Sequence, residues 1–271
     1  MTVVLVTGGS SGIGLATVRR LAAAGHQVFC GSRQPSRAAL PGGVTPLPLD
    51  VADPAAAPAA IQSVVTAAGR LDVLVNNAGA GSLAPLEETA DAEAHRIFEV
   101  NVFGPMRLAS AALPVMRAQG GGRIINVTSE NDTAPAPFGG WYSASKAALA
   151  SLSMVLGAEV HPFGVFVTVV APGLFRTAMS AGLGDYAVAA GSAYAAPFGA
   201  LMASNRAAVQ HAGDPDEVAR AIGDCMAASQ PPARIVVGAD AAQLDTTIRS
   251  ASAEDLARLL RDFVAGLTAG P

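Results

Sequence analysis

Tyr142 and Lys146 are four residues apart, a spacing that could support proton transfer. On a helix, side chains at this spacing share one face, and their Cβ atoms lie roughly 5–6 Å apart. A free phenol has a pKa of about 10 and is a poor proton carrier at neutral pH. An ammonium near 4 Å favours the phenolate by roughly 4 kcal/mol at an effective dielectric of about 20. The pair therefore indicates a tyrosine that serves as a general acid or base near pH 7.

The pair lies in a segment whose composition favours a helix. Residues 143–160 are rich in alanine, leucine, serine and methionine, which predicts a helix over this range. Lys146 is also the only lysine of the chain, and every other permanent cation is an arginine. An arginine-biased composition leaves unexplained why this position kept its lysine. A surface lysine that happens to follow a core tyrosine is the alternative for this pair alone.

The N-terminal residues predict a dinucleotide-binding site. A buried strand over residues 3–7 precedes a glycine-rich turn, a helical pattern over residues 15–24 and a second strand from residue 27. This order is typical of the first half of a dinucleotide fold. The glycines let the backbone approach a pyrophosphate, which then faces the N-terminus of the helix. The turn residues expected to bind the cofactor are Gly8, Ser10, Ser11, Gly12, Ile13 and Gly14.

The second strand ends without the acidic residue that NAD sites use. Such a carboxylate usually binds the ribose 2′-hydroxyl about 20 residues after the turn, yet no aspartate or glutamate precedes Asp50. Arg33 follows the strand instead, and its guanidinium, with Ser10 or Ser11 as a hydroxyl donor, suits a 2′-phosphate. We therefore expect NADP(H), with NAD(H) less favoured. A solvated turn residue is the alternative role for Arg33.

Polar or small residues also follow the strands predicted at residues 45–49, 71–75, 123–127 and 163–170. The carboxyl ends of parallel strands meet at one edge of a sheet, where such sheets bind ligands. The turn after the strand at 71–75, which includes Asn77, Ala78 and Gly79, is therefore expected to bind the ligand, with a plain βα turn as the alternative if it stood alone. Ser129, at the end of the strand at 123–127, could meet the phenol of Tyr142 in space.

The remaining pattern predicts helices and one irregular segment. Helices are expected at residues 55–68, 92–102, 106–119, 214–227 and 254–267, and a seventh strand at 234–237. Asn101 lies near the end of one of these helices, where a buried amide needs hydrogen-bond partners. Residues 178–213 carry little charge and indicate an insertion or a flexible lid. We find no repeat and no linker, so we expect one α/β domain over residues 1–271.

Composition excludes several classes of protein. The apolar fraction of 51% supports a sizeable core, yet no run approaches the roughly 18 apolar residues of a membrane span. The N-terminus lacks the basic region of a signal peptide. Two cysteines, Cys30 and Cys225, form no disulfide or metal framework, so a cytoplasmic location is expected. A net charge of −4 without a basic block argues against nucleic-acid binding, and four scattered histidines argue against a metal site.

Together these motifs resemble the short-chain dehydrogenase/reductase family over about residues 1–240. Residues 7–14 match its TGxxxGxG turn, residues 76–79 match its NNAG motif, and Asp50-Val51 match its adenine-contacting pair. The family's catalytic tetrad is matched by Asn101, Ser129, Tyr142 and Lys146. The resemblance implies a Rossmann-type doubly wound fold of about seven parallel strands. Residues 31–33, 178–213 and 234–238 resemble the branch that includes hydroxysteroid and retinol dehydrogenases.

The resemblance also implies roles for the tetrad. Tyr142 would pass a proton to or from the substrate oxygen, and Ser129 would hydrogen-bond that oxygen. Lys146 would lower the pKa of Tyr142 and bind the nicotinamide ribose, and Asn101 would hold a water that relays protons through Lys146. Pro172, Gly173 and Thr177 would hold the nicotinamide. One departure is that Glu130-Asn131-Asp132 replace the family's small residues after Ser129. These side chains are expected to point to solvent; the alternative is that the carboxylates disfavour anionic substrates or select a polar group.

We therefore expect an oxidoreductase that interconverts a carbonyl and an alcohol on a mostly apolar small molecule. An apolar pocket is suggested by Met179, Leu183, Tyr186, Tyr194, Phe198 and Met202, with Phe138 and Trp141 as its other wall; core packing is an equal interpretation of the first set. The alternatives are a non-catalytic dinucleotide-binding redox sensor, and lyase or epimerase chemistry with bound cofactor. Small residues at 144, 147, 148 and 151 allow close helix contact, as in the family's helix-bundle dimers, so a homodimer or homotetramer is expected.

Overall fold

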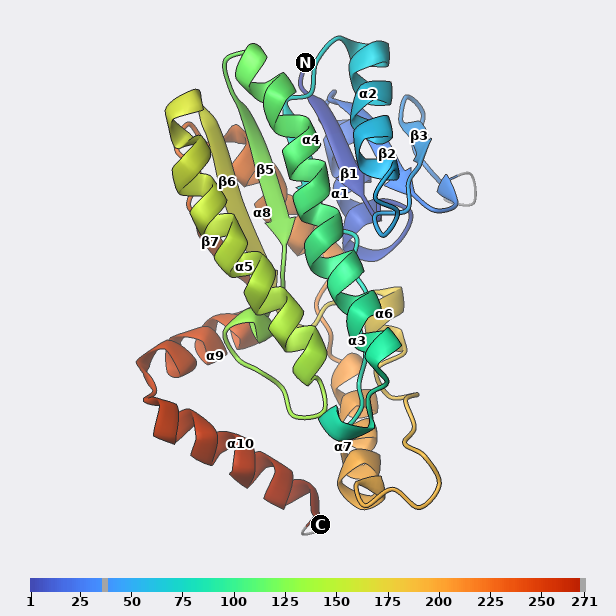
Figure 1. The fold of residues 1–271 in the computed structure, drawn as a ribbon, viewed down its shortest axis with the longest axis vertical. Coiled ribbons are helices and arrows are strands. Elements are labelled where there is room, and N and C mark those ends of the chain that lie inside the picture. Colours follow the sequence, from blue (N-terminus) through green and yellow to red (C-terminus); the bar gives the residue numbers. More distant parts are fainter. Residues whose placement is uncertain (36–38, 269–271) are drawn as a thin grey trace.

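Seven parallel strands form one sheet in the computed structural model of the chain, which describes residues 1–35 and 39–268. The strand order is β3-β2-β1-β4-β5-β6-β7 (Figure 1). The strands are β1 (Val3–Thr7), β2 (Gln27–Ser32), β3 (Thr45–Pro48), β4 (Val73–Asn76), β5 (Gly122–Val127), β6 (Val165–Pro172) and β7 (Arg234–Val237). This arrangement confirms the expected doubly wound α/β fold.

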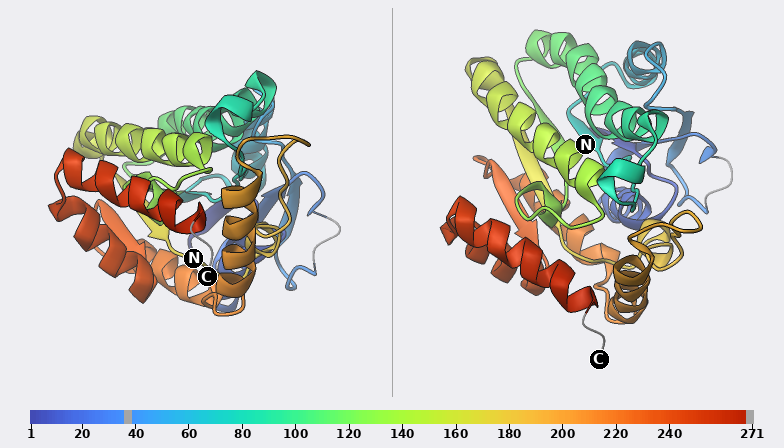
Figure 2. Two further views of the ribbon diagram at one scale, coloured as in Figure 1. Left: turned by 90° about the horizontal axis from the view of Figure 1, so that it is seen from below. Right: turned by 60° about the horizontal axis from the view of Figure 1, so that its bottom comes forward.

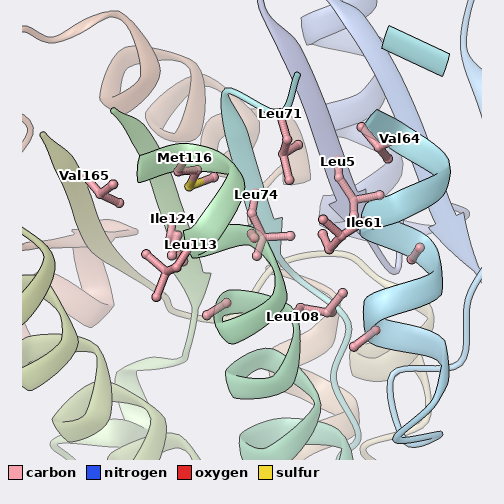
Figure 3. Packing of buried hydrophobic residues seen from close by; sticks show 14 of the residues in the cluster. Leu5, Ile61, Val64, Leu71, Leu74, Leu108, Leu113, Met116, Ile124 and Val165 are labelled. Carbon is pink, nitrogen blue, oxygen red and sulfur yellow. The ribbon is translucent and has the colours of Figure 1, made fainter. Parts of the chain in front are cut away.

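Helices cover both faces of the sheet, which explains why the central strands are continuous apolar runs rather than alternating ones. One face packs against α2 (Ala56–Ala68), α4 (Gly104–Ala118) and α5 (Gly140–Val160), and the other against α1 (Gly12–Ala23) and α8 (Pro215–Ala227) (Figures 1 and 2). Every residue of β1 is buried. Figure 3 shows the first layer, where Leu5 and Leu74 of the sheet meet Ile61 of α2 and Leu108 of α4.

Local signals explain several helix ends. Asp214 accepts a hydrogen bond from the backbone N–H of Asp216, and Pro215 occupies the first turn, so α8 begins where the sequence predicted. Gly69 ends α2 in the left-handed conformation, with φ of 75°. The described residues contain no helix with the length and apolarity that a bilayer crossing requires.

Three segments differ from the prediction. Between α3 (Asp91–Phe98) and α4 the chain forms a π-helical segment, Glu99–Phe103, where a helix end was expected. The irregular stretch 178–213 contains α6 (Ala178–Ala181) and the long helix α7 (Ala195–Val209). A helix that the sequence did not predict, α9 (Ala239–Ser250), precedes the last helix, α10 (Ala253–Thr268).

A separate apolar cluster forms beyond the carboxyl ends of the strands, where Figure 1 shows α6, α7 and α10. Its buried members are Phe138, Phe198, Leu201 and Met202, and Tyr186, Tyr194 and Leu267 pack against them. The expectation that Phe138 and Trp141 line the pocket is therefore wrong. Phe138 packs edge-on against Phe198, and the partly exposed Trp141 packs edge-on against Phe98.

Candidate active site

A cleft of about 900 Å³ opens at the carboxyl ends of the strands. It gathers most of the residues that the sequence singled out, from the glycine turn after β1 to the segment after β6. The predicted residues that line it are Gly8, Ser10, Ser11, Gly12, Ile13, Arg33, Asp50, Val51, Asn77, Ala78, Gly79, Ser129, Tyr142, Lys146, Pro172, Gly173 and Thr177. Gly14 and Asn101 do not line it. Residues that are far apart in the sequence, such as Gly8 and Thr177, thus meet at the edge of the sheet where parallel topology places ligand sites.

The glycine turn is held tightly against the end of β4. Gly8 and Gly12 adopt φ values of 64° and 51°, which side chains rarely accept. Asn77 donates from its amide to the carbonyl oxygens of Thr7 and Gly8, at 2.9 and 3.3 Å. Gly14 supports this packing from inside, because a Cβ there would lie 2.2 Å from the carbonyl oxygen of Gly8. At Gly8 and Gly12 the turn therefore presents backbone to the cleft, beside the start of α1.

The end of β2 adds a hydroxyl and a guanidinium to the cleft. Arg33 is exposed and lines the cleft, and Ser32 beside it is 7% exposed. The hydroxyl of Ser32 is buried without a hydrogen-bond partner among the described residues. Buried polar atoms normally have partners, so an orphan at the cleft wall suits a polar ligand group. The sequence analysis missed Ser32, although its place at a strand end next to Arg33 was a usable signal.

Tyr142 and Lys146 leave α5 on the same face, as their spacing predicted. Lys146 is 4% exposed, and its ammonium donates a 3.0 Å hydrogen bond to the carbonyl oxygen of Val127. The nitrogen lies 5.8 Å from the centre of the Tyr142 ring. Burial lowers the pKa of Lys146 to about 8, and the charge of Asp132 opposes that shift. The lysine therefore remains largely charged at pH 7.

The pKa of the Tyr142 phenol is raised, so the expectation that Lys146 lowers it is wrong, because burial outweighs the other effects. Burial raises its pKa above the ordinary value, a hydrogen bond with the side chain of Ser129 opposes this, and the charges of Glu130 and Asp132 add to it. Ser129 starts a short turn after β5, where its hydroxyl accepts a hydrogen bond from the N–H of Asn131 at 3.3 Å. Tyr142 and Ser129 thus both line the cleft, and the serine side chain lowers the pKa of the phenol against the larger effect of burial.

Asn101 lies fully buried behind these residues. Its amide accepts from the N–H of Ala80 and donates to the carbonyl oxygen of Ala80, both at 2.8 Å, and it donates to the hydroxyl of Ser145 at 3.0 Å. Its side-chain oxygen and the nitrogen of Lys146 both lie 3.5 Å from the point where a Cβ of Gly79 would be. The π-helical segment thus places the amide at the base of the cleft without a direct contact to the open space.

The residues after Ser129 do not point to solvent, so that expectation is wrong. Asp132 is buried and bonds Thr128 and Arg234, and Glu130 lines the cleft. Burial, with the nearby charge of Asp240, raises the pKa of Glu130 to about 7. Sequence reasoning missed this because Arg234 lies 102 positions away from Asp132.

Apolar side chains from the loop after β4 and from the segment after β6 also line the cleft. They are Leu83, Leu174, Phe175, Met179 and Leu183. Of the residues expected to form an apolar pocket, Met179 and Leu183 line the cleft, whereas Tyr186, Tyr194, Phe198 and Met202 pack in the separate cluster. Arg96 also lines the cleft, but its guanidinium is paired with Glu93 at 2.7 Å.

Comparison with known proteins identifies relatives of this chain. A family model described as short chain dehydrogenase matches residues 2–196. The 3-ketodihydrosphingosine reductase of Bacteroides thetaiotaomicron is 39% identical over 175 residues, 65% of this chain and 64% of that protein. The 17-beta-hydroxysteroid dehydrogenase type 1 of Homo sapiens is 39% identical over 191 residues, 65% of this chain and 58% of that protein. The chain thus spans less than two thirds of either relative.

Solved structures match over nearly the whole chain. A short-chain dehydrogenase from Streptomyces avermitilis is 34% identical with a TM-score of 0.80, covering 99% of this chain and 97% of that one. A short chain dehydrogenase from Burkholderia cenocepacia, in complex with NADP, is 26% identical with a TM-score of 0.77, covering 96% of this chain and 97% of that one.

Proposed function

The chain belongs to the short-chain dehydrogenase/reductase family, an NAD(P)-dependent oxidoreductase family, and from this premise we propose its reaction. We propose that it uses NADP(H) to interconvert a carbonyl and an alcohol on a mostly apolar small molecule. The observation that carries this proposal is the convergence of Tyr142, Ser129 and Lys146 on the same cleft as the glycine turn.

The cleft suits a dinucleotide. The close approach of Gly8 to Ala78 leaves no room for a side chain at that point of the turn, since a Cβ on Gly8 would lie 2.9 Å from the Cα of Ala78. Backbone N–H groups at the start of α1 favour a pyrophosphate. Asp50 and Val51 would hold the adenine, and Pro172, Gly173 and Thr177 would hold the nicotinamide. When bound, the cofactor supplies or accepts the hydride.

Three observations support NADP(H) over NAD(H). Arg33 is an exposed cation at the end of β2, and the buried hydroxyl of Ser32 next to it has no partner among the described residues. No carboxylate follows this strand before Asp50, and the Arg33 guanidinium and the Ser32 hydroxyl are donors that suit a 2′-phosphate. The similar short chain dehydrogenase from Burkholderia cenocepacia is in complex with NADP, which also supports this preference.

Tyr142 would then give a proton to the substrate oxygen during reduction. Its raised pKa keeps the phenol protonated at neutral pH, which suits proton donation. Ser129 would hydrogen-bond the same oxygen and orient it. The buried ammonium of Lys146, which lies 5.8 Å from the centre of the ring, would stabilise the phenolate that forms. Asn101 would fix the loop at Ala80 and hold the proton-relay water near Lys146.

The substrate end of the cleft supports a mostly apolar molecule. Leu83, Met179 and Leu183 come from loops that flank the reacting residues. Relatives named for 3-ketodihydrosphingosine and for a 17-beta-hydroxysteroid are consistent with a carbonyl or hydroxyl on such a molecule. We further propose that residues 1–271 act as one domain in the cytoplasm, with residues 178–213 closing over the substrate.

The exposed face of α5 supports a homodimer or homotetramer. The large apolar side chains of Leu152, Met154 and Val155 are 39–68% exposed. Phe103, which directly precedes α4, is 49% exposed. Such a cluster is typical of a protein interface, and the small residues Ala144, Ala147, Ala148 and Ser151 permit close helix contact. Light scattering on the wild type and on Val155→Lys tests this; a wild-type monomer would overturn it.

A turnover survey tests the proposed reaction against a redox-sensing role. The purified chain is mixed with NADPH or NADH and a panel of ketones, aldehydes and quinones, and cofactor oxidation is followed by absorbance. We expect turnover with at least one apolar ketone or aldehyde and a higher kcat/KM with NADPH. Tight NADPH binding without turnover on any panel member, or in the reverse direction with the matching alcohols, would support the sensor instead.

A further inference from the structure

A buried chain of charged side chains connects the turn of Ser129 to the C-terminal part of the protein. Arg234 of β7 donates to Asp132 at 2.9 Å and to Asp245 of α9 at 2.8 Å. Asp245 also accepts from Thr133 at 3.0 Å and from Arg249 at 2.8 Å. The side chains of Asp132, Asp245 and Arg234 are 0%, 14% and 18% exposed, and only Arg249, at 53%, reaches the surface among these four.

Asp132 clamps the turn on both sides of Ser129. One carboxylate oxygen accepts a 2.7 Å hydrogen bond from the hydroxyl of Thr128 and also the bond from Arg234. Thr128 directly precedes Ser129, and the backbone N–H of Asp132 donates to the carbonyl oxygen of Ser129 at 3.0 Å. The carboxylate therefore closes a ring around the serine, and Arg234 fixes that ring to β7.

The same chain holds the turn from the far side. Thr133 follows the turn directly, and its bond to Asp245 ties it to α9. Neither Asp132 nor Arg234 lines the cleft, so neither is in a position to touch a substrate. Without contact to the substrate, the pair acts through the position of Ser129, and Asp132 also acts through its charge, which raises the pKa of Tyr142.

Charge pairing alone is a competing explanation. Buried ion pairs often contribute little net stability, yet removal of one partner is costly because it leaves a buried charge unpaired. One oxygen of Asp132 and the Nε of Arg234 also lack hydrogen-bond partners within the described residues, so this pair is not fully satisfied. The Asp132–Arg234 pair lies directly behind Ser129. It is therefore better explained by the geometry that it imposes on the turn of Ser129 than by a contribution to stability.

We propose, on the basis of the proposed function, that Asp132 and Arg234, anchored by Asp245, are positioning residues that hold the Ser129 hydroxyl against Tyr142. Loss of the pair should lower kcat, since Ser129 orients the substrate oxygen. It should leave NADPH binding unchanged, since the chain lies away from the glycine turn. Helix α9 thus contributes to catalysis without lining the cleft.

The test compares single and double variants. Arg234→Met leaves Asp132 unpaired and is expected to lower both the melting temperature and kcat. Asp132→Asn with Arg234→Met removes both charges, so the melting temperature should recover most of that loss. We expect kcat of this double variant to stay at least tenfold below wild type, with the NADPH dissociation constant within twofold. Arg234→Lys, which keeps the charge, should restore part of kcat.

A second readout needs no turnover and protects the test if Arg234→Met fails to fold. Amide hydrogen exchange over residues 128–134 should quicken in the double variant and, less strongly, in Asp245→Asn. Arg258→Met, which breaks the exposed Arg258–Asp255 pair of α10, is the matched control and should leave exchange in this segment and kcat unchanged.

The outcomes separate this proposal from the proposed function. A double variant with wild-type kcat and wild-type exchange, beside a Ser129→Ala variant that loses kcat, would overturn the positioning role alone. A Ser129→Ala variant with wild-type kcat would overturn the catalytic role of Ser129 in the proposed function, while the exchange measurement would still decide whether the pair holds the turn.

Discussion

The ammonium of Lys146 donates a 3.0 Å hydrogen bond to the carbonyl oxygen of Val127, which ties α5 to the end of β5 beneath the cleft. Val127 lies two residues before Ser129 in the chain, and Lys146 lies one helical turn after Tyr142. The contact therefore holds the lysine between these two residues. The cation is thereby held in a buried position, 5.8 Å from the centre of the Tyr142 ring.

Burial of this charge should cost stability, and Lys146→Met should recover it. The folded pKa of about 8 lies below the ordinary 10.5. The unfolded chain therefore binds more protons between these values, and stability rises with pH across that window. At pH 7 the cost is fully present, so Lys146→Met should gain up to about 3 kcal/mol of unfolding free energy, less the lost hydrogen bond. Urea unfolding at pH 7 and at pH 10.5 measures this, and a gain of equal size at both values would contradict it.

Glu130 should tune the pH dependence of the reaction. Its ionised carboxylate raises the pKa of Tyr142, after the larger effect of burial and alongside Asp132. Alcohol oxidation needs the phenolate, so Glu130→Gln should move the rising limb of kcat/KM against pH to lower pH. Because the pKa of Glu130 is itself about 7, the two enzymes should differ mainly above that pH. Matching profiles above pH 7 would show that this carboxylate does not act on Tyr142.

Arg33 should set the cofactor preference. Charge-assisted hydrogen bonds to a 2′-phosphate contribute about 1.5–3 kcal/mol each, so Arg33→Gln should weaken NADPH binding roughly tenfold to a hundredfold. NADH, which has no such phosphate, should bind within twofold of wild type. Arg19→Gln, at an exposed position of α1, is the control. Calorimetry with both cofactors decides the matter, and equal losses for NADPH and NADH would remove Arg33 from this role.

Gly14 should be intolerant of a single methyl group. A Cβ there would lie 2.2 Å from the carbonyl oxygen of Gly8 and 2.5 Å from the amide nitrogen of Asn77. Backbone cannot yield easily, so Gly14→Ala should cost about 1–3 kcal/mol of unfolding free energy and weaken NADPH binding. Gly42→Ala, where no atom lies within 4 Å of the new Cβ, should change neither. A Gly14→Ala protein with wild-type stability would show that the turn relaxes.

Local patterns predicted the parts of the fold that depend on neighbours in sequence. The apolar run of β1, the glycines that follow it and the capping residues of α8 each act over a few positions, so their elements were found with correct types. The turn at residues 76–79 and Ser129 were placed at the cleft because parallel topology brings strand ends together, whereas Asp50, Val51, Pro172, Gly173 and Thr177 were named through the family resemblance. These signals were enough to place Tyr142 and Lys146 on one helix face.

Contacts between distant residues were not predictable in this way. Asp132 looked like a solvent-facing acid because its partner Arg234 lies on the seventh strand. Helix α7 lies in an alanine-rich segment without a clear helical periodicity of apolar residues, so it was not predicted. Its inward side chains form a separate cluster with Phe138. The π-helical segment around Asn101 gives no periodic signal, since it adds a residue to a turn of an otherwise regular helix.

The most direct measurement is NADPH oxidation by Tyr142→Phe on a substrate that the wild type reduces. NADPH binding by the variant is measured in parallel, and Tyr194→Phe, whose hydroxyl bonds Glu87 away from the cleft, is the control. We expect Tyr142→Phe to bind NADPH within about twofold and to lose kcat by roughly 10²- to 10⁴-fold, while Tyr194→Phe keeps wild-type kcat. Turnover by Tyr142→Phe within a few fold of wild type would contradict the assignment of Tyr142 as the proton donor.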